Sequence, residues 1–318
     1  MLTGTVSNQE SLAKLACAFA GLVWGVFWIP LRALDAAGVS GAWATAFYYV
    51  VPFVLLLPLG VVRFRQLRAG GWRLQLTGLI AGASMVLYAD AVLHTEVIRA
   101  MLLYYLTPVW SFALARIWLN ERIGVGRMLT IVLGLFGMLV ILGADSGTPW
   151  PRNAGDWMGL ASGMVWAVAA VLMRGDGKTT AIDYSLVYFA WGTVIAVALT
   201  QLPFSAGHPP LLEHVLATGF WSVPFVALLV VPAVLAMMWG TPLLNPGVVG
   251  LLFMTEISVG TVTAAIWAGE PFGMREIVGV VLITAAGLAE VMVAPLGRLR
   301  SRRPGSGSAA TPRRAGSS

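Results

Sequence analysis

The sequence predicts an all-α integral membrane protein with ten transmembrane helices, arranged as two inverted five-helix repeats. The first reason is composition: 58% of the 318 residues are hydrophobic, 11% are charged, and the mean hydropathy is +0.82, far from the balance of a soluble domain. The second is a succession of apolar stretches that reach the length of a membrane span, about 20 residues. The third is internal similarity, because IWLNERIG from Ile117 returns as IWAGEPFG from Ile266.

The basic character of the chain does not indicate a nucleic-acid-binding protein. The net charge is +6 and the pI is 9.9, but six of the twenty basic residues lie in the Ser-, Gly- and Pro-rich segment 297–318, which we expect to be disordered. Cys17 is the single cysteine, which excludes an intramolecular disulfide and a cysteine-based metal site. We expect no metal and no cofactor, since the sequence has no metal-ligand spacing and no phosphate-binding glycine loop.

Ten stretches are long and apolar enough to cross about 30 Å of hydrocarbon. They cover residues 11–33, 41–62, 74–93, 96–119, 126–143, 157–173, 184–202, 217–239, 247–268 and 275–295. Short connectors rich in turn-forming residues separate them, which leaves no room for a soluble domain. We therefore expect an N-terminal cytoplasmic segment (1–10), a first repeat (11–144), an outer connector (145–156), a second repeat (157–296) and a cytoplasmic tail (297–318).

The distribution of Lys and Arg predicts the orientation. With both termini on one side, that side holds sixteen basic residues and the other holds four. Without the tail the split is ten to four. Because positively charged loops stay in the cytoplasm, we expect a multi-pass protein of the plasma (inner) membrane with both termini cytoplasmic.

The internal similarity extends over four predicted spans. With a constant offset of 149 positions, Leu102-Leu103-Tyr104 matches Leu251-Leu252-Phe253, and Glu121 matches Glu270. A second similarity relates the surroundings of Trp24 and Trp166. Chance resemblance between apolar helices is the alternative explanation. If the similarity is a duplication, the odd number of spans in each copy inverts the second copy, as in many secondary transporters.

These residues resemble the EamA-like branch of the drug/metabolite transporter superfamily. The resemblance rests on Trp24-Gly25, on the partial second copy Trp166-Ala167, on Glu121 and Glu270, and on Pro108 in the fourth span. Ile257, which is the counterpart of Pro108, departs from the pattern. The resemblance covers about residues 11–295 and implies a transporter with two five-helix repeats. It leaves the solute open, because the family handles amino acids, sugars, cofactors and drugs.

Two kinds of carboxylate have to be distinguished. Glu121 and Glu270 each lie between two spans, at the start of the next helix, where a carboxylate stabilises the positive helix end by roughly 0.3–1 kcal/mol. Glu256 instead lies about ten residues inside its span, where an ionised residue costs about 2.5–3.5 kcal/mol. We interpret Glu121 and Glu270 as structural and Glu256 as functional.

Glu256 belongs to a semi-polar helix face that the repeat duplicates. Phe253, Gly260 and Thr263 share its face, and the corresponding residues of the fourth span are Tyr104, Thr107 and Ser111. We expect the two faces to meet at a substrate cavity between the repeats. There Glu256 would accept a proton, as the coupling site, or neutralise a cationic solute; the alternative is a protonated Glu256 that only joins two helices.

Further candidate substrate-binding residues lie near the outer end and inside the first spans of the two repeats. Asp90 and Arg99 lie close to the connector between the predicted spans 74–93 and 96–119, and they fit either an outer gate or an ion pair that closes a turn. Trp24 and Trp166 fit either helix packing or a stacking surface for a solute.

The predicted function is secondary transport, with export of small organic metabolites such as amino acids or related amphipathic compounds. The partners are a small-molecule solute, membrane lipid and protons, with no nucleic acid, and the protein would work as a monomer or homodimer. A non-transporting membrane receptor or scaffold is the alternative. An intramembrane enzyme is a third class, which the sequence does not favour because it offers no nucleophile or metal centre at membrane depth.

Overall fold

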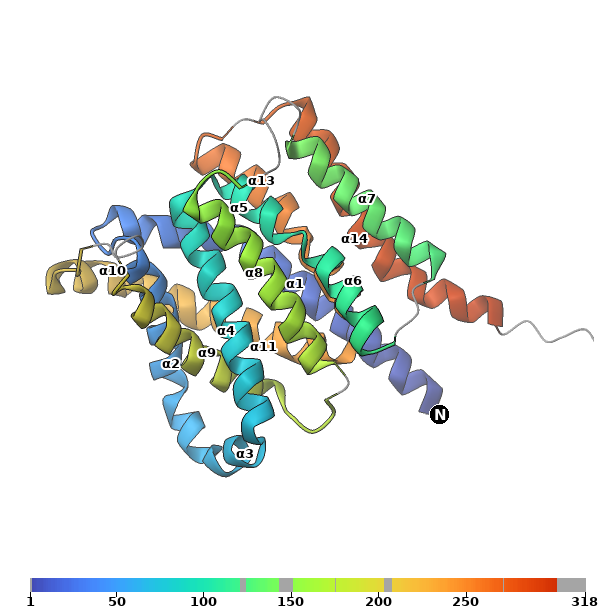
Figure 1. Cartoon of the computed structure of the whole chain (residues 1–318), viewed down its shortest axis with the longest axis horizontal. Coiled ribbons are helices and arrows are strands. Elements are labelled where there is room, and N and C mark those ends of the chain that lie inside the picture. Colours follow the sequence, from blue (N-terminus) through green and yellow to red (C-terminus); the bar gives the residue numbers. More distant parts are fainter. Residues whose placement is uncertain are drawn as a thin grey trace, which may run out of the picture.

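Every regular element in the described part of the chain is a helix. The computed structural model of the protein describes residues 2–120, 124–142, 151–174, 176–202, 208–270 and 272–301. The helices are α1 (Leu2–Ala36), α2 (Ala42–Val62), α3 (Phe64–Ala69), α4 (Gly71–His94), α5 (Val97–Tyr104), α6 (Thr107–Trp118), α7 (Val125–Leu142), α8 (Ala154–Met173), α9 (Ala181–Leu199), α10 (Leu212–Phe225), η1 (Val226–Val230), α11 (Val231–Gly240), η2 (Thr241–Leu243), α12 (Pro246–Phe253), α13 (Thr255–Trp267) and α14 (Met274–Ser301) (Figure 1). This confirms the prediction of an all-α integral membrane protein.

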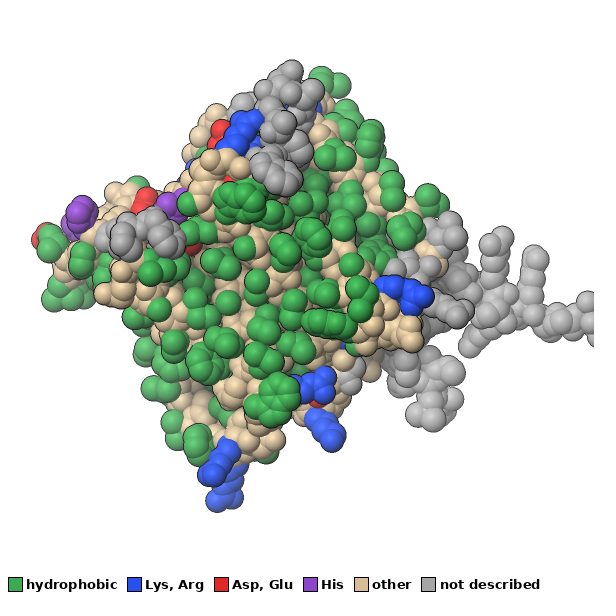
Figure 2. All heavy atoms as spheres, viewed as in Figure 1, with side chains coloured by type: hydrophobic (Ala, Val, Ile, Leu, Met, Phe, Trp, Pro, Cys, Tyr) green, Lys and Arg blue, Asp and Glu red, His purple; other side chains and the backbone are tan. Residues whose placement is uncertain are grey.

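Eight helical segments within the described ranges are long and apolar enough to cross a membrane. They are Asn8–Ala36, Ala42–Val62, Gly71–His94, Val97–Trp118, Ala154–Met173, Ala181–Leu199, Leu212–Leu243 and Pro246–Trp267. Figure 2 shows apolar side chains over the middle of one face, with Lys and Arg side chains at its lower edge, the end that carries α3. The apolar stretch of α7, Met128–Ile141, is shorter than a full span. The count of ten spans therefore stays a prediction.

Two interrupted spans break at corresponding positions. The segment Val97–Trp118 divides into α5 and α6 at Tyr105 and Leu106, and Pro246–Trp267 divides into α12 and α13 at Met254. The bounds of α5 and α12 are separated by 149 positions at both ends, the offset of the sequence similarity. Pro108, in the first turn of α6, explains one break because proline has no backbone N–H. The second break has no proline, since α13 begins Thr-Glu-Ile.

A π-helical turn interrupts the segment Leu212–Leu243. This turn, η1, lies between α10 and α11, and prolines flank it at Pro224 and Pro232. Proline has no backbone N–H, so each of these two residues removes one hydrogen-bond donor from the helix. This local loss explains why the stretch between them adopts the wider hydrogen-bond pattern of a π-helix.

Close helix packing holds the bundle together. α4 packs on α8 and α9, α1 packs on α11, α12 and α13, and α7 lies beside α14 (Figure 1). Two glycine positions show how close the backbones come: a Cβ on Gly163 of α8 would run into the Tyr104 carbonyl oxygen, and one on Gly25 of α1 would lie 2.6 Å from Val259 of α13. Small residues permit such contact where apolar lipid supplies no hydrophobic driving force.

Candidate functional site

Glu256 lies in the first turn of α13, directly after the break, and is 1% exposed. Both of its carboxyl oxygens have partners from the first half of the chain. The hydroxyl of Tyr88, from α4, donates to Oε1, and the hydroxyl of Tyr105, at the break between α5 and α6, lies 2.5 Å from Oε2. The Tyr105 hydroxyl also lies 2.6 Å from the Phe253 carbonyl oxygen. A carboxyl group thus joins the two interrupted spans and α4.

Aromatic rings surround this carboxyl. The rings of Tyr88 and Tyr104 have centroids 4.8 Å apart, and Tyr104 meets Tyr105 edge-on at the same distance. Trp166, from α8, lies 5.8 Å from Phe253. All five side chains are buried. Their arrangement can stabilise a flat or cationic group by stacking and cation–π contact.

The structure brings together most of the residues predicted for the substrate site. Thr107 donates to the Tyr104 carbonyl oxygen at 2.5 Å and lies 3.2 Å from that of Gly163, so it joins α6 to α8 beside the aromatic rings. Ser111 follows one turn later on α6 and is fully buried. Trp24 is placed differently, with its ring 5.1 Å from Phe27 in an edge contact. Phe27 in turn contacts Tyr48 of α2.

Three predicted residues carry buried polar atoms with no hydrogen-bond partner among the described residues. These atoms are the indole Nε1 of Trp24, the indole Nε1 of Trp166 and the hydroxyl of Ser111. Buried donors of this kind are costly unless another group satisfies them. They are therefore candidate contacts for a polar group of a solute.

Sequence reasoning missed the acidic partner of Arg99. Arg99, on α5, forms an ion pair with Asp156 in the first turn of α8, at 2.6 Å between Nε and Oδ2. Asp156 is fully buried and also accepts from the Thr95 hydroxyl at 2.8 Å. Asp90 lies one turn before His94 at the end of α4, and its Oδ2 is 3.6 Å from Nδ1 of His94. Arg99 therefore pairs with the second half of the chain, whereas Asp90 pairs with His94 of its own helix.

The position of Glu270 corrects one expectation. Its carboxylate does not bind the start of the following helix; it accepts from the backbone N–H groups of Val97 and Ile98, at 2.9 and 3.2 Å, and so caps α5. The start of α14 has its own acceptor, because Glu276 accepts from the Gly273 N–H at 2.6 Å. The physical role is the predicted one, stabilisation of a positive helix end, but the helix belongs to the other half. Glu121 lies outside the described residues.

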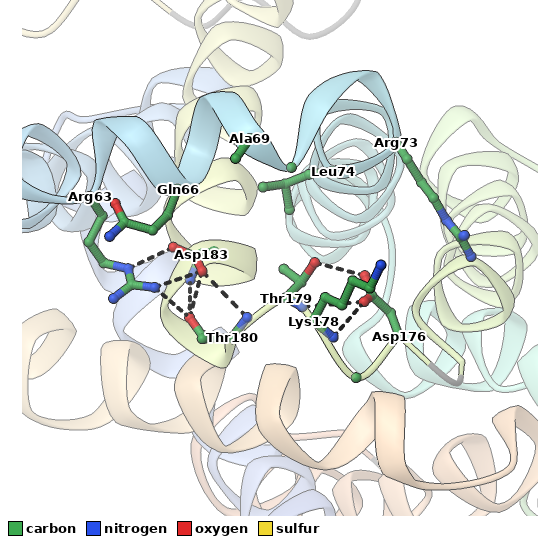
Figure 3. A pocket seen from close by; sticks show the side chains of 12 residues that line it. Arg63, Gln66, Ala69, Arg73, Leu74, Asp176, Lys178, Thr179, Thr180 and Asp183 are labelled. Carbon is green, nitrogen blue, oxygen red and sulfur yellow. Dashed lines mark hydrogen bonds and ion pairs between the residues drawn. The ribbon is translucent and has the colours of Figure 1, made fainter.

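A cavity of about 590 Å³ lies at the opposite end from Glu270, away from Glu256. We call it the basic cavity; it lies between α3, the start of α4 and the connection from α8 to α9 (Figure 3). The charged residues that line it are Arg63, Arg73, Lys178, Asp176 and Asp183. Sequence analysis did not identify it, because its residues come from three separate segments.

Asp176 fixes the connection from α8 to α9. Its carboxylate accepts from the Lys178 N–H at 3.0 Å, from the Thr179 hydroxyl at 2.7 Å and from the Tyr184 hydroxyl at 2.8 Å. Partial burial raises the pKa of Asp176, but the hydrogen bonds from Thr179, Lys178 and Tyr184 outweigh burial and bring the pKa down to about 2. Asp176 is therefore ionised at all physiological pH values.

Comparison with known proteins agrees with these features. Residues 11–143 match the EamA-like transporter family. The chain is similar to an uncharacterized transporter of Archaeoglobus fulgidus, 28% identical over 139 residues, which are 37% of this chain and 49% of that protein. It is similar to the uncharacterized transporter YyaM of Bacillus subtilis, 22% identical over 79% of this chain and 85% of that protein. It is also similar to a riboflavin transporter of Rhizobium johnstonii, 24% identical over 63% of this chain and 68% of that protein.

A solved crystal structure has the same fold. It superimposes with a TM-score of 0.66 at 18% identity and covers 90% of this chain and 98% of that one. The archaeal relative is matched over about half of its own length. The family match over residues 11–143 and the relatives named as transporters together support a membrane transporter that is similar to the EamA-like transporter family.

Proposed function

We propose that this protein is a secondary active transporter that exports small organic metabolites, such as amino acids or related amphipathic compounds. Transport proceeds by alternating access between two inverted five-helix repeats in the plasma membrane, with both termini cytoplasmic, in a monomer or homodimer. The observation that carries the proposal is the buried Glu256 carboxyl of the second half, bound by Tyr88 and Tyr105 of the first half. A buried ionisable group between two halves of a bundle is costly, which favours a functional role.

The matched breaks support the two repeats. α5 and α12 have corresponding bounds, and Glu256 directly follows the break between α12 and α13. Interrupted helices are the usual site of substrate and ion binding in transporters built from inverted repeats. We therefore place the solute between these breaks.

The hydrogen bonds of Tyr105 support proton coupling through Glu256. The Tyr105 hydroxyl faces two acceptors, Oε2 of Glu256 and the Phe253 carbonyl oxygen, but it carries one hydrogen. A protonated Glu256 resolves this, because it donates to Tyr105 while Tyr105 donates to Phe253. An ionised Glu256 is favoured instead by the positive start of α13. The site suits both protonation states, as a proton carrier requires.

The contacts of Glu270 and Arg99 support a closed outer end. Glu270 ties the segment after α13 to the start of α5, and Arg99 ties α5 to Asp156 of α8. We propose that both contacts break when the outer end opens. Solute binding and proton movement offset the free energy that is lost when these two contacts break.

The aromatic site limits the class of solute. Tyr88, Tyr104, Tyr105, Trp166 and Phe253 offer ring faces, while Glu256 offers a carboxyl. A compound with a flat or apolar body and an amino group fits these features. One relative carries the name riboflavin transporter, and riboflavin is a flat aromatic compound, so riboflavin belongs in the first panel of solutes.

The experiment is counterflow of labelled amino acids and riboflavin in liposomes that contain the purified protein. We expect flux that depends on the pH gradient, and Glu256→Gln should abolish that dependence. Glu213→Gln, an exposed glutamate on α10, is the matched control and should leave it unchanged. An unchanged pH dependence in Glu256→Gln would remove Glu256 from the coupling mechanism. Flux no greater than that of empty liposomes for every solute would favour a receptor or scaffold, and solute turnover without flux would favour an enzyme.

A further inference from the structure

We propose that the basic cavity binds the phosphate group of an anionic phospholipid, with Arg73 and Lys178 as its contacts. The cavity has a volume of about 590 Å³, within the range of small-molecule sites. It lies apart from the aromatic residues around Glu256, so the proposal is independent of the transported solute. Binding of a phosphate requires cationic groups that other residues do not neutralise, and binding of a lipid requires that its headgroup can reach them.

Two of the charged residues neutralise one another. Arg63, directly after α2, forms a bidentate ion pair with Asp183 of α9. Its Nε donates to Oδ1 at 2.7 Å and its Nη2 donates to Oδ2 at 2.8 Å. Its Nη2 also donates to the Thr180 hydroxyl at 3.2 Å. Thr180 and Asp183 form a capping box at the start of α9. This pair builds the wall of the cavity and adds no net charge to it.

The remaining charges favour an anion. Four neutral donors already bond to the Asp176 carboxylate, namely the N–H groups of Lys178 and Thr179 and the hydroxyls of Thr179 and Tyr184, so its charge is stabilised without Arg73 or Lys178. Arg73 makes one long hydrogen bond, from Nη2 to the Leu172 carbonyl oxygen at 3.4 Å, and keeps most of its five N–H donors. No ion pair or side-chain hydrogen bond to another described residue involves the Lys178 ammonium. Figure 3 shows both cationic side chains on the same side of the cavity as Asp176.

The cavity walls are fixed before a ligand arrives. Asp176 holds the turn that presents Lys178, and the contact between Arg63 and Asp183 holds α2 against α9. A preorganised site loses less conformational entropy on binding than one that must order its side chains. The geometry therefore favours a specific phosphate contact over a loose attraction between charges.

Exposed apolar residues that neighbour the cavity's lining residues in the sequence point to a lipid as the source of the phosphate. Val61 and Val62, at the end of α2, and Phe64 of α3 are exposed by 60% or more, and Trp72 precedes Arg73 with 77% exposure. In a membrane protein such exposed apolar residues face acyl chains, and Trp gathers at the interface where lipid headgroups lie. A phosphodiester in the cavity would place its acyl chains against these residues. Basic pockets at helix ends bind anionic headgroups for this reason.

The experiment measures thermal unfolding of the full-length protein in a zwitterionic detergent. Short-chain phosphatidylglycerol, phosphatidylcholine with the same chains, and inorganic phosphate are titrated separately. We expect phosphatidylglycerol to raise the unfolding temperature, and Arg73→Gln/Lys178→Gln to need on the order of tenfold more of it, since each lost contact to a charged phosphate is a strong one. Arg65→Gln/Arg68→Gln removes the same charge from exposed positions on α3 that do not line the cavity, and it should behave as the wild type.

Three results would overturn the proposal. Equal stabilisation by phosphatidylcholine would remove the role of the phosphate charge. An equal loss in Arg65→Gln/Arg68→Gln would show attraction to the whole surface instead of a site. Saturation by inorganic phosphate at the same concentration would make free phosphate the ligand. If the double variant fails to fold, Lys178→Gln alone tests the proposal, because this substitution removes no bond between side chains. It should weaken phosphatidylglycerol binding without changing the unfolding temperature in detergent alone.

Discussion

The cap that Glu270 places on α5 can be tested by Glu270→Gln. The carboxylate accepts from two backbone N–H groups, those of Val97 and Ile98. Glutamine keeps one acceptor oxygen, so one N–H loses its partner and the other loses a charged one. An orphaned donor costs about 1–3 kcal/mol and the lost charge at a helix start about 0.3–1 kcal/mol. Because Glu270 is partly exposed, water can bond to the orphaned N–H and offset part of this cost. We therefore expect the unfolding free energy to fall by about 1–2 kcal/mol.

The assay for this prediction is unfolding of purified protein in detergent, with Glu96→Gln as the matched control. Glu96 precedes the same helix, is exposed, and makes no side-chain cap on α5. Its substitution should cost about 0.3 kcal/mol, the low end for a charge at an exposed helix start. If Glu270→Gln loses no more stability than Glu96→Gln, the hydrogen bonds from α5 do not stabilise the protein and the proposed closure of the outer end loses its main contact.

Three further changes should have measurable effects. Asp156→Asn removes the charge that compensates buried Arg99, so the unfolding free energy should fall by about 3 kcal/mol; a loss below 1 kcal/mol would contradict a desolvated pair. Gly163→Ala drives a Cβ into the Tyr104 carbonyl oxygen and should cost about 1–3 kcal/mol, whereas a neutral effect would mean that α8 can move away. The pKa of Asp176 is about 2 in the folded protein against 3.8 ordinarily, so its stabilising effect should be complete above pH 4 and disappear as the pH falls toward 2. Since this residue is only partly buried and solvent screens its charge, the effect should stay below about 1 kcal/mol, and Asp176→Asn should flatten the pH dependence in that window.

The burial of Glu256 was predictable, while its partners were not. Distance along an apolar stretch places a residue at mid-depth without knowledge of any neighbour, and Glu256 is indeed buried. Which tyrosines meet it depends on the rotation of α4 and α5 about their own axes. The rotation of α4 is set by close contacts, such as Gly82 against Gly192 of α9, which a single sequence does not reveal.

Two acidic residues show the same limit in different ways. The helix-capping role of Glu270 follows from local chemistry and was predicted, but the choice of α5 as the capped helix depends on how the connection folds back. The sequence does not single out Asp156, because acidic residues are common in the first turn of a helix. Its partner Arg99 lies 57 positions away in sequence, and their contact follows from the packing of α5 on α8.

The matched helix breaks have a consequence for which sequences this fold accepts. Each break leaves a carbonyl oxygen without its helical partner, at Tyr104 and at Phe253, and each oxygen takes a hydrogen from a nearby hydroxyl, that of Thr107 or of Tyr105. In hydrocarbon no water can replace a lost donor. Variation at Thr107 and Tyr105 is therefore confined to side chains that can still donate, so valine and phenylalanine, which are nearest in shape, should be the substitutions that natural drift avoids.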